Sequence, residues 1–292
     1  MSLADAFPQI TKTREPLAPY THLRIGGPAE FFVQPRAVPE LAAVLKFCAA
    51  NRVPLRMLGG GYNLLVRDDP VPGAVVRLSG PAFAGVETAG RTVRAGGGAQ
   101  LFDVIAHAVR AGLGGLESLV GIRGAVGGSV RCNVGDRSGE IAASVRRVAV
   151  LTDDGAEQVR ARDELAFGDH SSDLDEPVVL WVEFGLEPDR PEALLKRMRK
   201  AWIQRRAAEP FLHQAAVRMF RDPPGHAAAA LIDRAGLAKH RVGGAEVSDR
   251  NGNYVVAHPG TTAGDVLALI DRVRDRVKAA TGVALDRELR VW

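Results

Sequence analysis

The feature that most constrains the fold is a run of three glycines between two apolar segments, Leu58-Gly59-Gly60-Gly61-Tyr62-Asn63-Leu64-Leu65-Val66. Glycine loses more conformational freedom on folding than other residues, so such a run indicates positive φ angles or a backbone that another group approaches closely. Backbone N–H groups gathered in a tight turn can bind an anion, and phosphate is a common ligand. The run therefore predicts either a phosphate-binding loop or a glycine-rich hairpin.

The residues before this run predict a βαβ unit. Residues 30–33 alternate as a strand does, and from Pro39 to Asn51 apolar positions recur at helical spacing. A strand at residues 55–58 then leads into the glycines. The Rossmann spacing G-x-G-x-x-G followed by a helix is absent, because Tyr62-Asn63 leads directly into an apolar run. A nucleotide is plausible here, but on another fold.

A second glycine cluster follows at Gly121-Ile122-Arg123-Gly124-Ala125-Val126-Gly127-Gly128. Before it, residues 75–78 and 92–95 read as strands, and residues 101–109 read as a helix that Gly112 can end. Structural turns would explain either glycine cluster alone. Because apolar segments flank both, we favour a dinucleotide that the two clusters hold from two sides.

The remaining chain predicts two antiparallel strands and a helical C-terminal part. The strands are residues 145–151 and 178–186, and residues 187–191 look like a domain boundary. A helix follows with Leu194, Leu195, Met198 and Trp202 on one face. The expected later elements are a helix at 226–235, a strand at 254–257, a helix that begins with a capping box at 262–265 and ends at Gly282, and a final strand within 285–292.

Composition excludes several classes of protein. The 292 residues are 46% hydrophobic and 25% charged, with a net charge of +4, which is typical of a globular protein of one large or two domains. Basic and acidic residues are interleaved, so we expect no nucleic-acid partner. Cys48 and Cys132 lie far apart without metal-ligand spacing, so we expect no metal site and a reducing cytoplasm. We see no secretory signal and no apolar run of membrane-spanning length.

Four blocks in this order resemble the UDP-N-acetylenolpyruvoylglucosamine reductase (MurB) family. They are Thr21-x-x-Arg24-Ile25-Gly26-Gly27-Pro28-Ala29, Leu58-Gly59-Gly60-Gly61-x-Asn63-Leu64-Leu65-Val66, Gly121-Ile122-x-Gly124-x-Val126-Gly127-Gly128 and Gly243-Gly244-Ala245-x-Val247-Ser248. The resemblance covers nearly the whole chain. Four ordered blocks are far more specific than one glycine loop, and the chain looks like the shorter subtype, without the tyrosine-loop insertion.

The resemblance implies an α+β fold with an FAD-binding domain of the PCMH type, similar to vanillyl-alcohol oxidase, and a C-terminal substrate domain. We expect the FAD domain at residues 1–188, with two subdomains split near residue 70. The substrate domain is expected at 189–292, with residues 285–292 returning to the active site. The residues expected to bind FAD are Arg24, Gly59, Gly60, Gly61, Tyr62, Asn63, Leu64, Gly121, Ile122, Gly124, Ala125, Val126, Gly127 and Gly128.

The family resemblance also implies a reaction. NADPH reduces FAD, the reduced flavin passes hydride to an enolpyruvyl carbon of UDP-N-acetylglucosamine enolpyruvate, and a side-chain acid protonates the neighbouring carbon. Such a site must polarise a carboxylate with cations and hold a proton donor against the enol. The implied protein is a cytoplasmic flavoprotein of peptidoglycan synthesis with a nucleotide-sugar substrate, no nucleic-acid or membrane partner, and a monomeric or weakly oligomeric state.

Several residues depart from the family pattern where the chemistry is expected. Arg218 occupies the position of the family's Ser or Cys proton donor, and an arginine stays protonated but can bind an anionic group. His170 replaces the arginine that would stabilise the enolate. Asn251 stands where histidine is usual, and Tyr62 where serine is usual.

Glu288 matches the family's C-terminal catalytic glutamate, so we expect the catalytic set Glu288, Arg218 and His170. Two enzyme hypotheses follow from these residues. The chain is either a working enolpyruvyl reductase, in which Glu288 or His170 donates the proton, or a divergent FAD-binding paralogue with another substrate or without the reductase step. A third hypothesis, a non-catalytic flavin or nucleotide-sugar binding protein, rests only on the replaced residues.

Overall fold

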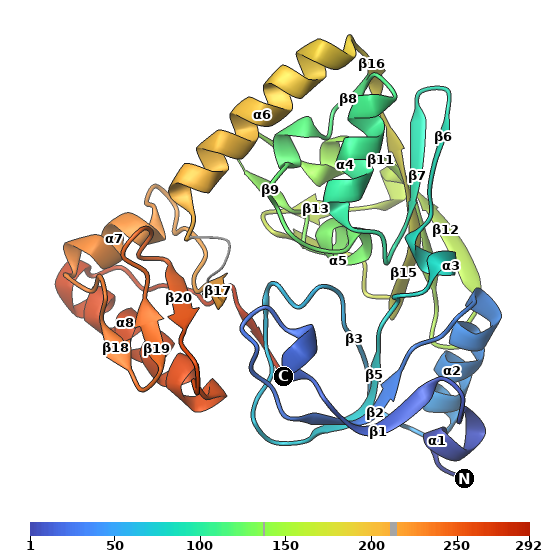
Figure 1. Cartoon of the computed structure of the whole chain (residues 1–292), viewed down its shortest axis with the longest axis horizontal. Coiled ribbons are helices and arrows are strands. Elements are labelled where there is room, and N and C mark those ends of the chain that lie inside the picture. Colours follow the sequence, from blue (N-terminus) through green and yellow to red (C-terminus); the bar gives the residue numbers. More distant parts are fainter. Residues whose placement is uncertain (137, 211–214) are drawn as a thin grey trace. The chain divides into compact units, whose positions relative to one another are not determined.

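A computed structural model of the chain describes residues 1–136, 138–210 and 215–292 (Figure 1). The chain forms two compact units, and each contains separate stretches of the sequence. The stretches of unit 1 are Met1–Thr13, Glu30–Gly59 and Pro72–Gln204, and those of unit 2 are Arg14–Ala29, Gly60–Val71 and Arg205–Trp292. These compact units differ from the expected FAD-binding domain at 1–188 and substrate domain at 189–292. The division into those two functional domains stays a prediction.

Helices and strands both occur throughout the described chain. The α-helices are α1 (Leu3–Ala6), α2 (Val38–Ala50), α3 (Pro81–Ala84), α4 (Leu101–Arg110), α5 (Val126–Arg131), α6 (Pro191–Ala208), α7 (Ala228–Arg234) and α8 (Ala263–Thr281). Short 3₁₀-helices are η1 (Ala18–Tyr20), η2 (Glu117–Leu119), η3 (Ile141–Ala143) and η4 (Arg162–Glu164). The first strands are β1 (Thr11–Pro16), β2 (Pro28–Val33), β3 (Leu55–Met57), β4 (Leu64–Leu65), β5 (Val71–Val76), β6 (Val86–Ala89), β7 (Thr92–Gly96) and β8 (Leu113–Gly114).

The later strands belong to two larger sheets and several short pairs. They are β9 (Gly135–Asp136), β10 (Gly139–Glu140), β11 (Val145–Leu151), β12 (Glu157–Ala161), β13 (Phe167–Gly168), β14 (Ser171–Ser172), β15 (Val178–Gly185), β16 (Glu187–Pro188), β17 (Ala215–Arg218), β18 (Arg241–Val242), β19 (Ala245–Val247), β20 (Tyr254–Ala257) and β21 (Arg290–Val291). The mixed helix and strand content confirms the predicted α+β class.

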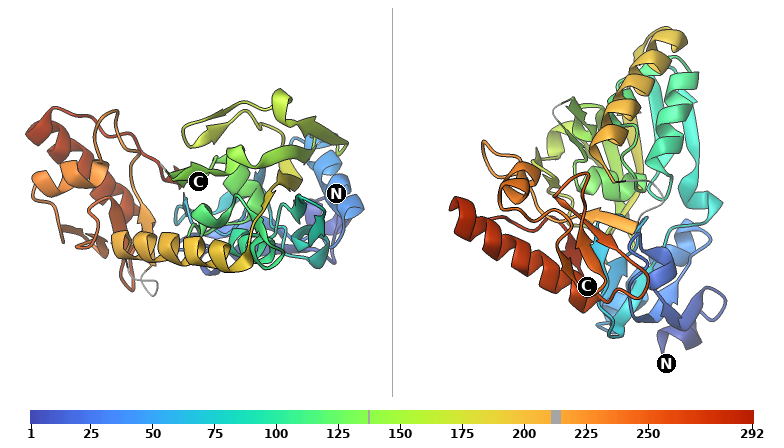
Figure 2. Two further views of the ribbon diagram at one scale, coloured as in Figure 1. Left: turned by 90° about the horizontal axis from the view of Figure 1, so that it is seen from above. Right: turned by 60° about the vertical axis from the view of Figure 1, so that its left-hand side comes forward.

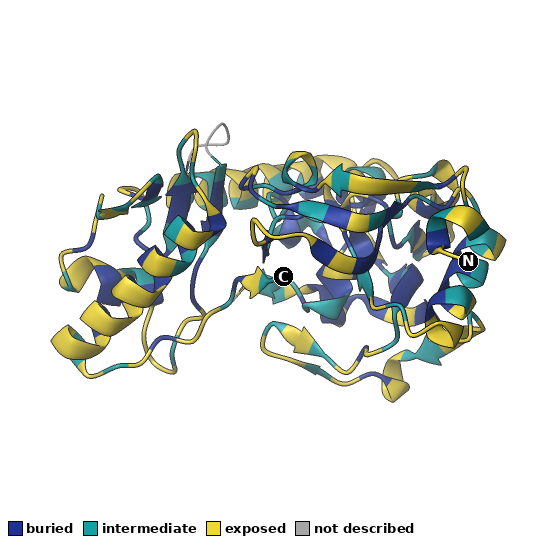
Figure 3. Cartoon of the chain, turned by 90° about the horizontal axis from the view of Figure 1, so that it is seen from below, coloured by how far each residue is buried: buried dark blue, intermediate teal, exposed yellow. Residues whose placement is uncertain are grey.

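Unit 1 is built around a five-stranded antiparallel sheet in the order β12-β11-β15-β7-β6. Val148 and Val150 of β11 pack into one apolar cluster with α4, whereas Ala149 and Leu151 join a second cluster with α2. Apolar side chains on both faces explain why β11 and β15 read as continuous apolar runs. Figure 3 colours the ribbon by burial, with buried residues in dark blue.

A second sheet of four strands has the order β1-β2-β5-β3, and β3 runs parallel to β5. The helix predicted from Pro39 to Asn51 is confirmed as α2, whose C-cap is Asn51. The strand predicted at residues 75–78 instead begins earlier, as β5 from Val71 to Val76. The strand begins early because Val71 and residues 73–76 are buried, and these residues precede most of the predicted strand at 75–78.

Unit 2 contains a four-stranded antiparallel sheet in the order β17-β20-β19-β18, with α7 and α8 in the same apolar cluster. The predicted capping box is confirmed, since Asp265 N–H donates to Thr262 Oγ1 at 3.1 Å and Thr262 N–H donates to Asp265 Oδ2 at 3.0 Å. Gly282 ends α8 with φ +75°, a left-handed value that suits glycine. The final strand β21 runs parallel to β4.

One sequence-based expectation, the apolar face of α6, needs correction by long-range packing. The sequence places Leu195 and Trp202 on the apolar face of α6, the gold helix in Figure 2. However, Leu195 is 37% exposed and Trp202 is 44% exposed, while Leu194 is buried. Leu194 and Met198 contact the core of unit 1, so the buried side of α6 lies one residue earlier in each turn. Leu23, Ile25 and Leu65 join the core of unit 2, which explains why N-terminal segments belong to that unit.

Candidate active site

The first glycine run begins in unit 1 at the end of β3. Leu58 N–H donates to Val76 O at 2.8 Å, which fixes the strand before the turn. A Cβ added to Gly59 would come 3.8 Å from Ala125 Cβ, and this ordinary contact is the nearest one at Gly59. Gly59 therefore adjoins the second glycine cluster within unit 1, as the prediction of one shared ligand requires.

Gly61, in unit 2, has a structural reason to be glycine. Its φ is +65°, and an added Cβ would lie 2.4 Å from Tyr20 O, which is too close for any side chain. His22 N–H also donates to Gly61 O at 3.0 Å. The backbone that approaches Gly61 closely is thus the protein's own, so this glycine on its own is no evidence for a ligand.

The residues after Gly61 connect to the C-terminal segment of unit 2. Asn63 Nδ2 donates to Glu288 O at 3.4 Å, and Arg290 N–H donates to Asn63 O at 3.2 Å. Leu64 pairs with Arg290 in the β4–β21 ladder. Tyr62 is half-buried, and its ring lies 5.1 Å from the ring of His22, centre to centre. The end of the glycine run is therefore held beside Glu288.

The second glycine cluster forms the turn into α5 in unit 1. Gly121 and Gly124 have φ values of +90° and +153°, which favour glycine. Val126 N–H donates to Ala99 O at 2.8 Å, and Gly127 N–H donates to Gly97 O at 2.9 Å. A Cβ on Gly127 would lie 3.2 Å from Gly97 O. These residues hold α5 against the strand region that carries Gly97.

Two observations in this cluster fit a bound cofactor. Gly128 is exposed, and a Cβ added there would meet no atom within 4 Å, so the backbone is open on that side. In the described part of the chain, Ser129 Oγ is buried without a hydrogen-bond partner. A bare backbone beside an unsatisfied hydroxyl is typical of a surface that a polar ligand completes. The glycine cluster of unit 1 is thus suited to hold part of a dinucleotide such as FAD.

Arg24 is the remaining residue that we expected to contact the cofactor. It lies in unit 2 within the turn that Thr21 holds, because Thr21 Oγ1 donates to Ile25 O at 2.8 Å. Arg24 has φ +59°, and its side chain is exposed and donates to Pro19 O at 3.4 Å. The guanidinium is therefore accessible to an anionic group of a ligand.

Arg218 and Glu288 form an ion pair in unit 2. Arg218 Nε lies 3.1 Å from Glu288 Oε2, and the side chains are 29% and 15% exposed. Arg218 Nη2 lies 2.8 Å from Asp222 Oδ2, and Arg218 Nε donates to Phe220 O at 3.2 Å. Burial, the largest single effect, lowers the pKa of Arg218, but the carboxylates of Glu288 and Asp222 outweigh it and Tyr254 adds to their effect, so the pKa is raised.

This pairing decides which chemistry the two residues can perform. An arginine with a raised pKa does not release a proton at neutral pH. An opposite charge at 3.1 Å favours the ionised form of the Glu288 carboxyl group. The pair therefore offers a fixed carboxylate acceptor and a fixed cation, while neither side chain is suited to donate a proton.

Asn253 holds the backbone beside this pair, although no sequence pattern indicates this role. Phe220 N–H donates to Asn253 Oδ1 at 3.0 Å, and Asn253 Nδ2 donates to Phe220 O at 2.7 Å. Asn253 is 3% exposed. A buried amide that satisfies both backbone groups of one residue fixes the path of the chain after Arg218. The partners are 33 residues apart, which no local pattern reveals.

His170 lies in unit 1, in a tight hairpin turn. Gly168 pairs with Ser171, so Asp169 and His170 form the turn between β13 and β14. His170 has φ +48°, its side chain is 26% exposed, and Nε2 lies 3.9 Å from Asp169 Oδ1. Asn133, which is 1% exposed, donates through Nδ2 to Gly168 O at 2.9 Å. The imidazole is therefore presented on a turn that a buried amide holds.

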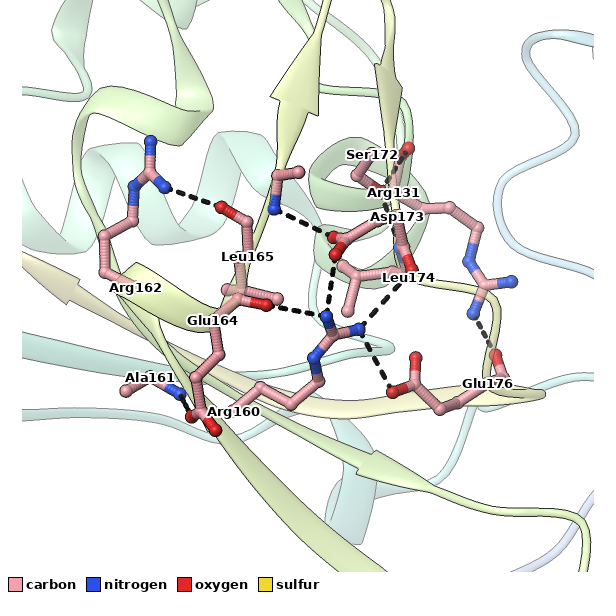
Figure 4. A network of polar contacts seen from close by, with 11 residues as sticks. Arg131, Arg160, Ala161, Arg162, Glu164, Leu165, Ser172, Asp173, Leu174 and Glu176 are labelled. Carbon is pink, nitrogen blue, oxygen red and sulfur yellow. Dashed lines mark hydrogen bonds and ion pairs between the residues drawn. The ribbon is translucent and has the colours of Figure 1, made fainter.

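A network of polar contacts fastens this hairpin to α5 and β12 (Figure 4). Arg160 donates to Asp173 Oδ2 at 2.7 Å and to Glu176 Oε1 at 3.2 Å. Arg131, the last residue of α5, donates to Glu176 O at 2.5 Å and accepts from Ser172 Oγ at 2.9 Å through its carbonyl oxygen. The glycine cluster and the His170 hairpin are thus connected through one set of side chains in unit 1.

Asn251, the other departure from the family pattern, has a structural role in unit 2. Its Nδ2 donates to Ala208 O at 2.8 Å, and Arg250 donates to Arg206 O and Ala207 O at 3.4 Å. These are carbonyl groups of the last turn of α6, which lack partners inside the helix. Asn251 therefore helps to cap a helix.

Residues 1–136, 138–210 and 215–292 contain neither a membrane-spanning helix nor a metal-binding group of side chains. No helix in these ranges combines the length and apolar character that crossing a membrane requires. The same ranges contain no group of three or more His, Cys, Asp or Glu side chains placed to hold a metal ion.

Comparison with known proteins gives matches over both units. Residues 209–292 match the family described as UDP-N-acetylenolpyruvoylglucosamine reductase, C-terminal domain, and residues 29–160 match the FAD binding domain family. The UDP-N-acetylenolpyruvoylglucosamine reductase of Rhodopirellula baltica is 36% identical over 295 residues, which cover 100% of this chain and 97% of the relative. UDP-N-acetylenolpyruvoylglucosamine reductase 2 of Symbiobacterium thermophilum is 39% identical over 280 residues, with 95% and 91% coverage.

The fold is also similar to a solved structure. The crystal structure of UDP-N-acetylenolpyruvylglucosamine reductase (MurB) from Thermus caldophilus aligns with a TM-score of 0.83 and 37% sequence identity. The alignment covers 97% of this chain and 98% of that chain. The similarity therefore extends through the candidate site residues of both units.

Proposed function

This chain belongs to the UDP-N-acetylenolpyruvoylglucosamine reductase (MurB) family, and we propose that unit 1 provides flavin-binding residues while the Arg218–Glu288 pair of unit 2 acts on the substrate. Its function is that of the family, an FAD-dependent reduction in peptidoglycan synthesis with a nucleotide-sugar substrate and NADPH as hydride donor. The observation that carries this function is identity of 36% over 100% of the chain.

The flavin-binding role of unit 1 rests on its glycine cluster. FAD bound there would supply the two-electron chemistry that connects NADPH with the enolpyruvyl group. The open backbone at Gly128 and the unsatisfied Ser129 Oγ support binding of a polar part of the cofactor there. Gly121, Ile122, Gly124, Ala125, Val126 and Gly127 shape the same turn. Gly59 adjoins this turn through Ala125.

Residues of unit 2 extend the proposed flavin-binding set. Arg24 has an exposed guanidinium for an anionic group, and Gly60, Gly61, Tyr62, Asn63 and Leu64 continue the glycine run. Gly61 acts indirectly, because its absent side chain lets the backbone of Tyr20 pass. Asn63 connects the run to Glu288 through its amide.

We assign different tasks to the three catalytic candidates. Glu288, paired with Arg218, accepts a hydrogen bond from the substrate and orients it, because its charged form is favoured. Arg218 positions Glu288 and supplies positive charge at the site. His170, on its hairpin in unit 1, supplies an N–H donor for an anionic group of a ligand. The sequence-based suggestion that Glu288 donates the proton is not part of this proposal.

The divergent-paralogue hypothesis gains no support from the comparisons, because the relatives described above carry the reductase name. Arg218, His170 and Asn251, which depart from the family pattern, each have defined partners in the structure, so these departures do not leave the site without order.

Two finer points complete the proposal. The two free cysteines suit a cytoplasmic location, and we propose a monomer or weak oligomer.

The proposed function is tested by purifying the protein, titrating it with FAD and following NADPH oxidation with and without UDP-N-acetylglucosamine enolpyruvate. We expect one FAD for each chain and NADPH consumption that depends on the sugar nucleotide. A preparation that takes up no FAD contradicts the flavin role of unit 1. NADPH consumption that ignores the sugar nucleotide contradicts the substrate assignment.

A further inference from the structure

Reduction of an enolpyruvyl double bond needs a proton donor, and neither Arg218 nor Glu288 is suited to donate a proton. Arg218 has a raised pKa and keeps its proton, and its charge favours ionised Glu288. Because this inference rests on the proposed function, another side chain near the Arg218–Glu288 pair must carry a transferable proton at neutral pH. Tyr254 is such a side chain.

The sheet of unit 2 places Tyr254 directly beside Arg218. In the β17–β20 ladder Arg218 is the partner of Tyr254, and Val217 is the partner of Val255. Val217 and Val255 are at most 1% exposed and pack with α8 in the core, so Arg218 and Tyr254 point to the opposite face. Directly opposed residues on antiparallel strands have Cβ atoms roughly 5 Å apart.

The backbone of Tyr254 is held on both sides. Tyr254 N–H donates to Asn251 O at 3.0 Å, and Tyr254 O accepts from Ser248 N–H at 2.9 Å. The preceding residue, Asn253, holds the backbone of Phe220 through its buried amide. The same short segment therefore fixes both Tyr254 and the turn that follows Arg218.

Electrostatics support this placement. The pKa of Arg218 is lowered by burial and raised by Glu288, Asp222 and Tyr254, with a net rise. A contribution from Tyr254 requires its hydroxyl group to lie within electrostatic reach of the guanidinium. Tyr254 is half-buried, so its hydroxyl is neither sealed in the core nor fully surrounded by water.

We propose that the Tyr254 hydroxyl donates the proton that completes reduction of the enolpyruvyl group. The carbon–carbon double bond becomes a single bond when one carbon gains a hydrogen with the electron pair that reduced FAD supplies, and the neighbouring carbon gains the proton of Tyr254. The resulting phenolate is stabilised by the Arg218 guanidinium and regains a proton from solvent. A phenol is protonated at neutral pH, with an ordinary pKa of about 10.

The test is Tyr254→Phe, which removes only the hydroxyl group, measured in separate half-reactions. NADPH should reduce the flavin of the variant at the parent rate. Reoxidation of the reduced flavin by UDP-N-acetylglucosamine enolpyruvate should slow by about a hundredfold or more, the usual contribution of a general acid. Reoxidation within threefold of the parent rate overturns the proposal.

The control is Tyr20→Phe, since Tyr20 is one of the three tyrosines and its hydroxyl donates to Glu15 Oε1 at 2.6 Å instead. This variant should reoxidise as the parent does, and equal slowing of both variants would overturn the assignment to Tyr254. The parent enzyme gives a second measurement that does not depend on folding of a variant. Its reoxidation should be slower in D2O, and an unchanged rate contradicts proton transfer from a hydroxyl group.

Failure of this proposal differs from failure of the proposed function. If the sugar nucleotide does not reoxidise the parent flavin at all, the proposed function is wrong. If it does so and Tyr254→Phe is equally fast, the reductase assignment stands and another group donates the proton.

Discussion

The glycine cluster of unit 1 and the Arg218–Glu288 pair of unit 2 specify their chemistry in different ways. The cluster depends on side chains that are absent, because Gly128 leaves open backbone and Gly121 and Gly124 have φ values that favour glycine. The pair depends on two opposite charges, with Arg218 Nε at 3.1 Å from Glu288 Oε2. A bare backbone accepts few substitutions, whereas a charged pair can be rebuilt from other residues. This difference explains how a chain can retain the family's glycine blocks and yet differ at Arg218 and His170.

Within the glycine run, Gly61→Ala tests whether the protein's own backbone requires an absent side chain. The added Cβ would lie 2.4 Å from Tyr20 O at φ +65°, so we expect a loss of about 3 kcal/mol in the free energy of unfolding. Urea denaturation of the apoprotein measures this loss. Gly90→Ala is the control, because Gly90 has φ +59° with no atom within 4 Å, and it should cost about 1 kcal/mol. Equal losses would show that the approach of Tyr20 is unimportant.

Glu288→Gln tests the charged side of the comparison. Because the orienting carboxylate is lost, reoxidation of the flavin by the sugar nucleotide should slow by about a hundredfold, with little change in flavin reduction. Glu246→Gln provides a matched control, since Glu246 is 14% exposed, against 15% for Glu288, and is likewise paired with an arginine of unit 2, Arg241. If both variants lose the same activity, Glu288 acts through stability alone.

Gly128→Ala tests the open backbone of unit 1 with a smaller expected effect. Its new methyl group meets no protein atom within 4 Å, so the apoprotein should keep its stability. If the cofactor packs there, crowding should weaken FAD binding by about tenfold, as overpacking by one methyl group does. Gly85→Ala, which also meets no atom within 4 Å, should leave FAD affinity unchanged. A flavin titration of both variants decides whether Gly128 contacts the cofactor.

Much of the fold was predictable because local patterns encode it. The helical spacing from Pro39 gave α2, and the capping box at Thr262 gave the start of α8. Backbone demands also show in the sequence, because only glycine suits the φ of +90° at Gly121. The family resemblance supplied FAD and the reaction, which no local pattern contains.

What the sequence did not reveal depends on contacts between distant residues. The exposed side of α6 is decided by where Leu194 meets the core of unit 1. The clamp of Asn253 on Phe220 and the pairing of Tyr254 with Arg218 both need the register of β17 with β20. The ion pair of Arg218 with Glu288 joins residues that no periodicity relates. Arg218 alone resembles a lost catalytic group, but with its partners we propose that it is a positioning residue.

The most direct test of the account is anaerobic double-mixing stopped-flow on the FAD-loaded protein, first with NADPH and then with UDP-N-acetylglucosamine enolpyruvate. The account predicts that flavin absorbance falls in the first step and recovers in the second. It also predicts that Glu288→Gln impairs only the second step. A parent flavin that NADPH reduces but the sugar nucleotide cannot reoxidise would contradict the assignment of the Arg218–Glu288 pair to enolpyruvyl reduction.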